Sequence, residues 1–162
     1  MSTNETIVSE ALGRLHKLSP AGYALGFHIE LMAPKFVFQT YPKAWLDHYS
    51  SNGLLMVDPM VAWGFSNEGT ERWSNLDDSS GVMKLASEYG MKFGAVVAVN
   101  TNGSRSLGGL ARSDRELTDE EIELIFKDMK LIHDATADTS ELNEATLAHL
   151  KKMAVMVTHP GS

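Results

Sequence analysis

The segment FGAVVAVN, residues 93–100, constrains the fold of this 162-residue chain most, because it is apolar at both alternating sets of positions. A strand of this kind is buried on both faces of its sheet, so it requires covering helices on both sides. The Asn102-Gly103 pair that follows is typical of a tight hairpin turn, which makes Ser106–Arg112 the expected partner strand. The sequence therefore predicts a covered antiparallel sheet.

A second hairpin is expected nearer the N-terminus. From Tyr23 to Met32 apolar and small or polar residues alternate with a period of two, as in a half-buried strand. Ala33-Pro34 interrupts this pattern, and Lys35–Thr40 resumes it with Phe36 and Phe38 on one side. We expect the two segments to pair antiparallel.

The helices are indicated by apolar spacings of three and four. Ile7–Leu18 has this spacing and stops before Pro20. Thr118 and Glu121 form a capping box ahead of an apolar stripe that runs to Ile132. Three shorter helices are expected between the hairpins, at Lys43–Ser51, Met60–Phe65 and Val82–Tyr89.

The order of these elements predicts an α+β fold, an α/β/α sandwich with a central antiparallel sheet of about five strands and helices on both faces. Ser79 or Ser80 is the expected cap of the helix that starts at Val82, and Gly90 its end. The polar, glycine-containing stretch Ser66–Arg72 is expected to be a loop.

Composition excludes several functions. The chain has 14 Lys+Arg against 21 Asp+Glu, and its net charge of −7 disfavours binding to phosphate backbones. Without cysteine it has no disulfide, thiolate nucleophile or cysteine zinc site, and its six histidines lack metal-ligand spacing, so we expect no metal and no cofactor. It shows no secretory leader and no membrane-spanning run, which predicts a cytoplasmic protein without a membrane partner.

One cluster of side chains stands out between residues 41 and 73. Tyr41, Trp45 and Tyr49 follow one another at intervals of four, which places them on one face of a helix, and Asp58-Pro59 and Trp73 come after them. Three aromatics beside an acid can line an apolar cavity that offers a few directional polar groups to a small amphipathic ligand. The same residues can equally be ordinary helix-to-sheet core, with Asp58 as a turn residue.

This cluster resembles the N-terminal autoinducer-binding domain of LuxR-type quorum-sensing transcription regulators. In that family a Tyr, a Trp, a second Tyr, an Asp-Pro and a second Trp recur at the spacings found in YPKAWLDHY, DPMV and Trp73. The resemblance extends over roughly residues 7–138, and Gly94 resembles a glycine of the family at the start of a strand. It implies a non-enzymatic sensor without catalytic residues that binds an acyl-homoserine lactone.

The resemblance also implies a role for each residue of the cluster. Trp45 donates its indole N–H to the lactone carbonyl, Tyr41 donates to the amide carbonyl, and Asp58 accepts the amide N–H. Tyr49 and Trp73 pack around the head group. The acyl tail is expected against apolar groups, namely Phe27, Phe36, Phe38, Met60, Val61, Val97 and Leu110.

Two departures from the family pattern affect function. Ala111 aligns where the family often carries a Ser or Thr that helps to hold the amide carbonyl, which predicts one hydrogen bond fewer; Ser113 lies two residues away. The expected domains are residues 1–138 for autoinducer binding and 139–162 for a linker and an incomplete first part of a helix-turn-helix. Leu142–Ala154 resembles the first helix of such a domain, and without its recognition helix no base readout is expected.

The family implies that ligand binding is coupled to folding, to homodimerisation and to DNA binding through the missing C-terminal domain. The alternative is a ligand-independent antagonist that forms heterodimers with a full-length regulator. A remoter alternative is a lactone-processing enzyme that uses Asp58 or His28. His28 and Glu30 share a strand face and could form an acid/base pair, but a solvated strand end is the preferred explanation.

Overall fold

The computed structural model describes residues 3–31 and 33–137. Five strands form a single sheet in the order β2-β1-β5-β4-β3, with every neighbouring pair antiparallel. The strands are β1 (Gly22–Glu30), β2 (Ala33–Gln39), β3 (Gly69–Arg72), β4 (Phe93–Thr101) and β5 (Ser104–Arg112). The helices are α1 (Thr3–Leu18), α2 (Lys43–Ser51), α3 (Pro59–Ser66), α4 (Val82–Glu88) and α5 (Asp119–Ala135), with 3₁₀ turns η1 (Leu54–Val57) and η2 (Trp73–Asn75).

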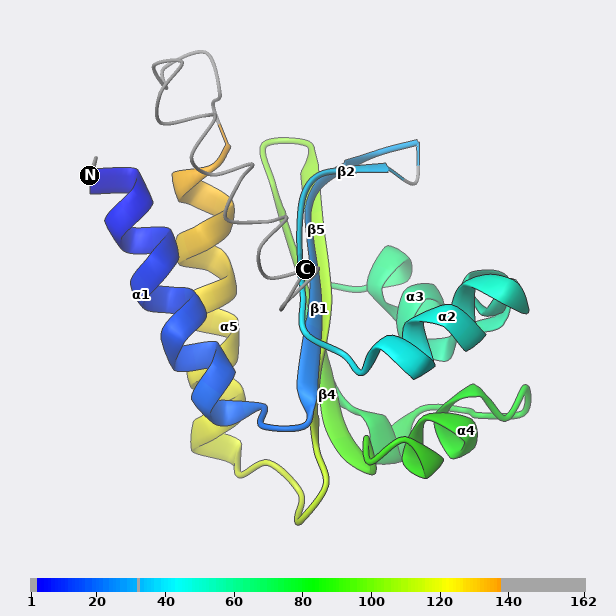
Figure 1. Ribbon diagram of the computed structural model, residues 1–162. Helices are drawn as coiled ribbons and strands as arrows, with labels where there is room; N and C mark the ends of the chain where they lie inside the picture. The colour runs from blue at the N-terminus through cyan, green and yellow to red at the C-terminus, as the bar shows by residue number, and fades with distance from the viewer. Residues whose placement is uncertain (1–2, 32, 138–162) are drawn as a thin grey trace.

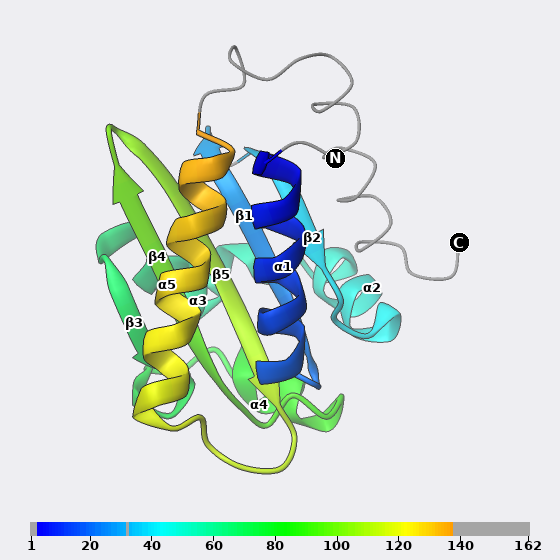
Figure 2. The same cartoon turned by 90° about the vertical axis from the view of Figure 1, so that its left-hand side faces the viewer.

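The sheet separates two layers of helices. The long helices α1 and α5 lie side by side on one face, and the shorter α2, α3 and α4 cover the other (Figures 1 and 2). This arrangement confirms the predicted α/β/α sandwich with a five-stranded antiparallel sheet. None of the helices within residues 3–31 and 33–137 is long and apolar enough to cross a bilayer. The expected helix at Leu142–Ala154 lies outside the described residues.

The face under α1 and α5 carries the larger core. Strand alternation sends Leu25 and Phe27 of β1 and Phe36 and Phe38 of β2 into this layer, where they meet the apolar stripes of the two long helices. The capping box of α5 is formed as predicted, with Thr118 and Glu121 bonding each other's backbone N–H groups at 3.1 and 2.9 Å.

The hairpin between β4 and β5 turns at Asn102-Gly103, and both residues have positive φ, 54° and 77°. Two consecutive left-handed residues define the turn type that matches strand twist, so this prediction is confirmed. β4 is buried on both faces from Gly94 to Val99 and is an interior strand, next to the edge strand β3.

Two local expectations need correction. Gly69–Arg72 is strand β3, although a loop was expected over Ser66–Arg72, because four polar residues at a sheet edge show no apolar alternation. The N-cap of α4 is Gly81, and the carboxylate of Asp78, three residues earlier, accepts from the N–H groups of Met83 and Lys84 at 2.9 and 3.0 Å. Ser79 and Ser80 do not cap this helix, because left-handed Gly81 at its start lets the chain curve back to Asp78.

Candidate ligand-binding site

A cavity of about 210 Å³ lies between the sheet and the short helices α2, α3 and α4. It is lined by backbone and side chains of β1, β2 and β5 on the sheet side and by the three helices and η1 on the other. The lining residues are Ala24, Leu25, Gly26, Ile29, Pro34, Val37, Gln39, Tyr41, Trp45, Leu46, Tyr49, Leu55, Asp58, Met60, Val61, Trp73, Val82, Met83, Ala86, Met91, Leu107, Gly108 and Gly109.

Small residues on the sheet create this space. Ala24 and Gly26 of β1 and Gly108 and Gly109 of β5 line the cavity, so the sheet presents little side-chain volume there. A Cβ atom on Gly109 would lie 2.7 Å from the Tyr41 hydroxyl oxygen. The glycine therefore allows Tyr41 to lie close against the sheet.

The aromatic residues come from α2 and from the segment just before it. Tyr41 lies two residues ahead of the helix, which begins at Lys43, so the expected three-residue helical face contains only Trp45 and Tyr49. The Trp45 ring packs against Tyr49 and Tyr89 with centroid separations of 5.7 and 5.4 Å. These contacts hold the indole at the cavity wall, where it is 3% exposed.

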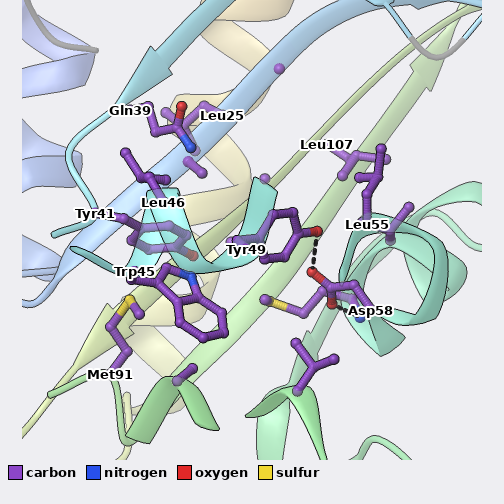
Figure 3. A pocket seen from close by; sticks show the side chains of 18 of the residues that line it. Leu25, Gln39, Tyr41, Trp45, Leu46, Tyr49, Leu55, Asp58, Met91 and Leu107 are labelled. Atoms are coloured by element: carbon purple, nitrogen blue, oxygen red, sulfur yellow. Dashed lines mark hydrogen bonds between the residues drawn. The ribbon is translucent and has the colours of Figure 1, made fainter. Parts of the chain in front are cut away.

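Asp58 is the acidic group of the cavity and is 5% exposed. It caps α3, because its Oδ1 accepts from the Met60 N–H at 2.8 Å, and its Oδ2 accepts from the Tyr49 hydroxyl at 2.8 Å (Figure 3). Burial raises the pKa of this carboxyl, and the bonds from Tyr49 and the α3 backbone oppose that rise. A carboxylate has about four acceptor sites, so Asp58 can accept from a further donor.

Two donors of the site lack a protein acceptor. The Tyr41 hydroxyl and the Trp73 indole N–H are buried without a hydrogen-bond partner among the residues that the structure describes. Burial, followed by the nearby Asp58 carboxylate, strongly raises the pKa of Tyr41, so the phenol stays protonated. An unpaired buried donor costs about 1–3 kcal/mol, which a bound molecule with acceptor atoms can recover.

Trp73 is positioned by a close contact with β4. A Cβ atom on Gly94 would lie 2.6 Å from the Trp73 ring and would also collide with the Leu110 carbonyl oxygen. Only glycine leaves room for the indole at this place, which gives a physical reason for Gly94.

The structure brings together most of the residues expected to contact a ligand. The cavity lining includes Tyr41, Trp45, Tyr49, Asp58, Met60, Val61 and Trp73. It does not include the expected tail contacts Phe27, Phe36, Phe38, Val97 and Leu110, which lie in the core under α1 and α5. Strand alternation turns these side chains to the opposite face of the sheet, so their expected position at the acyl tail is corrected. Ala111 packs in the cluster of Tyr41, Trp45 and Trp73 without lining the cavity.

Other lining residues were not anticipated. Val37 and Gln39 alternate with Phe36 and Phe38 along β2. The alternation of a strand therefore indicates that Val37 and Gln39 face the opposite side of the sheet from the two phenylalanines. The contributions of α4, such as Met83 and Ala86, have no comparable signal in the sequence, since they depend on how the helix folds back over the sheet.

His28 belongs to a different part of the molecule and is not a solvated strand end. It is 3% exposed and contacts His133 of α5, with ring centroids 4.4 Å apart. Its Nε2 donates to the His133 carbonyl oxygen at 2.9 Å, which leaves Nδ1 to accept from the Ser104 hydroxyl at 2.6 Å. Glu30 is exposed, so the two residues do not form a buried acid/base pair, and His28 lies apart from Asp58, across the sheet.

His133 completes this cluster. Its ring nitrogens bond the Ser106 hydroxyl at 2.6 Å and the Thr101 hydroxyl at 2.9 Å. Burial, together with the neighbouring His28, lowers the pKa of His133 to about 4, and burial also lowers the pKa of His28. Within residues 3–31 and 33–137 no three His, Cys, Asp or Glu side chains are grouped to hold a metal ion.

A covered sheet with an aromatic, largely apolar cavity and a few inward polar groups defines a small-molecule-binding sensor domain. The sequence profile of the autoinducer binding domain family of LuxR-type regulators matches residues 3–138, and the chain belongs to this family. It is 33% identical over 90 residues to the transcriptional activator protein SolR of Ralstonia nicotianae, covering 54% of this chain and 38% of SolR. It is 30% identical over 107 residues to the quorum-sensing regulator RhlR of Pseudomonas aeruginosa, covering 64% and 44%. The chain thus spans about two fifths of these relatives.

Solved structures share the fold. The crystal structure of Escherichia coli SdiA superposes with a TM-score of 0.62 at 22% identity, covering 90% of this chain and 64% of SdiA. CepR2 of Burkholderia cenocepacia, an N-acylhomoserine lactone dependent LuxR family transcription factor, gives a TM-score of 0.54 at 15% identity, covering 91% and 99%. A third structure is SdiA in complex with octanoyl-rac-glycerol, with a TM-score of 0.60 at 19% identity, covering 85% and 62%.

Proposed function

We propose that this chain binds an acyl-homoserine lactone in the cavity beneath α2, α3 and α4. The observation that carries the proposal is the set of polar groups in an otherwise apolar cavity. Tyr41 offers a buried hydroxyl that has no hydrogen-bond partner within residues 3–31 and 33–137, and Asp58 offers a carboxylate that can accept further hydrogen bonds. A secondary amide, with one donor and one acceptor, matches these two groups.

The proposed pose follows from these groups. The Asp58 carboxylate accepts the ligand amide N–H, the Tyr41 hydroxyl donates to the amide carbonyl, and the Trp45 indole donates to the lactone carbonyl. Tyr49 holds Asp58 in place through its hydrogen bond and does not itself need to touch the ligand. The acyl tail lies along the apolar lining, which includes Val37, Leu46, Met60 and Val61, at about 0.8 kcal/mol per buried methylene.

In the same proposal, the bound ligand stabilises the folded domain and favours a homodimer. The protein acts in the cytoplasm. The relative RhlR is an HTH-type quorum-sensing regulator. A full-length protein of this type would bind DNA through a C-terminal helix-turn-helix domain. Residues 138–162 lie outside the described part of the chain, and the start of that domain there remains a sequence-based expectation.

The experiment that tests the proposal is a thermal-shift titration with unsubstituted acyl-homoserine lactones of four to fourteen carbons, together with mass spectrometry of any co-purified molecule. At a hundredfold excess over Kd, binding stabilises the folded state by about 2.7 kcal/mol, or a Tm increase of roughly 5–10 °C. A shift that depends on chain length supports the proposal. A flat profile from a stable protein would instead favour the ligand-independent antagonist, which is then tested by heterodimer formation with a full-length regulator.

Two variants separate the polar contacts from the fold. Asp58→Asn keeps one oxygen that can cap α3 but replaces the other with an NH₂ group, which cannot accept the ligand amide N–H, so affinity should fall by roughly 10–100-fold with a near-normal Tm. Trp45→Phe keeps most apolar packing and removes the indole donor, and should weaken binding by about tenfold. Trp63→Phe is the matched control, because Trp63 lies in α3 but does not line the cavity. Unchanged affinity in both Asp58 and Trp45 variants would refute the assigned pose.

A further inference from the structure

Gln39 is a polar side chain of the cavity that the proposed head-group contacts do not use. It lies on β2, lines the cavity and is half-buried. Its amide makes no hydrogen bond to any residue that the structure describes. In Figure 3 it lies near Leu46, apart from the hydrogen-bonded pair of Tyr49 and Asp58.

The surroundings of Gln39 are apolar. Val37 precedes it by two residues on the same side of β2, Ala24 of β1 is its cross-strand partner, and Leu46 of α2 lines the same cavity. A ligand that extends from Asp58 past Leu46 would cover the amide and remove water from it. Covering an amide with alkyl groups leaves its donors and acceptor unpaired, which weakens binding relative to a ligand that pairs with them.

An amide can serve either kind of partner, since its NH₂ donates to a carbonyl oxygen and its carbonyl accepts from a hydroxyl. We propose that Gln39 is a specificity-determining residue that selects acyl chains bearing a carbonyl or hydroxyl oxygen over plain alkyl chains of the same length. This inference rests on the proposed function, because it assumes that an acyl chain occupies the cavity. The discrimination is expected to be about tenfold in Kd, the size of one hydrogen bond lost with its buried partner left unpaired.

The test compares lactones of equal chain length: unsubstituted, 3-oxo, 3-hydroxy and ω-hydroxy. Because the position of the oxygen is varied, the test does not assume how far along the chain Gln39 reaches. Affinities are measured by thermal shift and calorimetry for the wild type, for Gln39→Met and for Lys35→Met. Methionine matches glutamine in length but has no amide, and Lys35 is an exposed residue of the same strand that does not line the cavity.

For the wild type, at least one oxygenated lactone should bind about tenfold more tightly than its unsubstituted counterpart. Gln39→Met should bring this ratio close to one, with weaker binding of the oxygenated lactone and unchanged or tighter binding of the plain one. Lys35→Met should keep the wild-type ratio. The readout is a ratio between ligands, so a variant that is merely less stable does not change it.

Two failures are distinguishable. If lactones bind but Gln39→Met keeps the wild-type ratio, or if the wild type shows no preference, this inference is overturned and the proposed function stands. If no lactone binds at all, the proposed function is overturned, and the assignment of Gln39 to acyl-chain selection falls with it.

Discussion

Acidification should destabilise this domain through the buried pair of His28 and His133. The two ring centroids lie 4.4 Å apart, and the ring nitrogens bond the hydroxyls of Ser104, Ser106, Thr101 and Thr136 and the His133 carbonyl oxygen. Adding a proton to either ring places a charge in a buried site beside a second imidazole. The charged groups nearest the pair are Lys35, Glu30, Lys130 and Asp134, whose effects on the two pKa values are smaller than that of burial.

The magnitude follows from the lowered pKa of His133, about 4 in the folded protein against 6.5 for an ordinary histidine. Between these values the unfolded chain binds more protons, so the free energy of unfolding falls as the pH falls through this window. From pH 7 to pH 4.5 the loss is about 2 kcal/mol for His133. The lowered pKa of His28 adds a loss of the same sign. Above about pH 7.5 the pair contributes little pH dependence.

The assay is urea unfolding at half-unit pH steps from 7.5 to 4.5, for the wild type, His133→Gln and His16→Gln. His133→Gln should lower stability at pH 7 but flatten its decline toward pH 4.5, whereas exposed His16 provides a control whose substitution leaves the slope unchanged. The raised pKa of Asp58 acts in the opposite direction on acidification, and Glu121, with a pKa lowered to about 2, loses its contribution only below this window. A His133→Gln protein that keeps the wild-type slope would refute the reasoning.

Three further predictions concern packing, capping and the cavity. Gly94→Ala should lower the free energy of unfolding by about 1–3 kcal/mol, because its methyl group would press on the Trp73 ring, and chemical denaturation measures this loss. Thr118→Ala should cost about 1 kcal/mol through loss of the capping box of α5, with Thr118→Ser retaining most of the stability in the same assay. Gly109→Ala should displace the Tyr41 hydroxyl and weaken lactone binding about tenfold in calorimetry, while circular dichroism stays unchanged; normal affinity would count against the role of Tyr41.

The sequence was most informative where local physics and tertiary packing agree. The apolar stripe and capping box of α5, the Asn102-Gly103 turn and the doubly buried β4 each appear in the structure as expected. The spacing of Tyr41, Trp45, Tyr49, Asp58 and Trp73 also indicated one cluster, and all five residues line one cavity. In these cases the short-range pattern and the tertiary packing favour the same geometry.

The misjudged features depend on contacts between distant segments. Strand β3 is four polar residues that become a strand only through pairing with β4. Phe36 and Phe38 were expected at the acyl tail because they are apolar, although only the fold decides which face of β2 meets α1 and α5. His28 has φ of 56°, and this left-handed residue interrupts the alternation of β1, so that Ile29 lines the cavity while Leu31 is exposed.

The shared sheet divides the molecule into a densely filled layer and a layer that contains the cavity. Amide protons of α1, α5 and the central strands that they cover should therefore exchange only in global unfolding, with or without ligand. Amides of α2, α3 and α4 should exchange through smaller local openings, because these helices of seven to nine residues close over empty space. A bound signal molecule would then fill the cavity and complete the core of one layer. Slower amide hydrogen exchange in α2, α3 and α4 would report its binding.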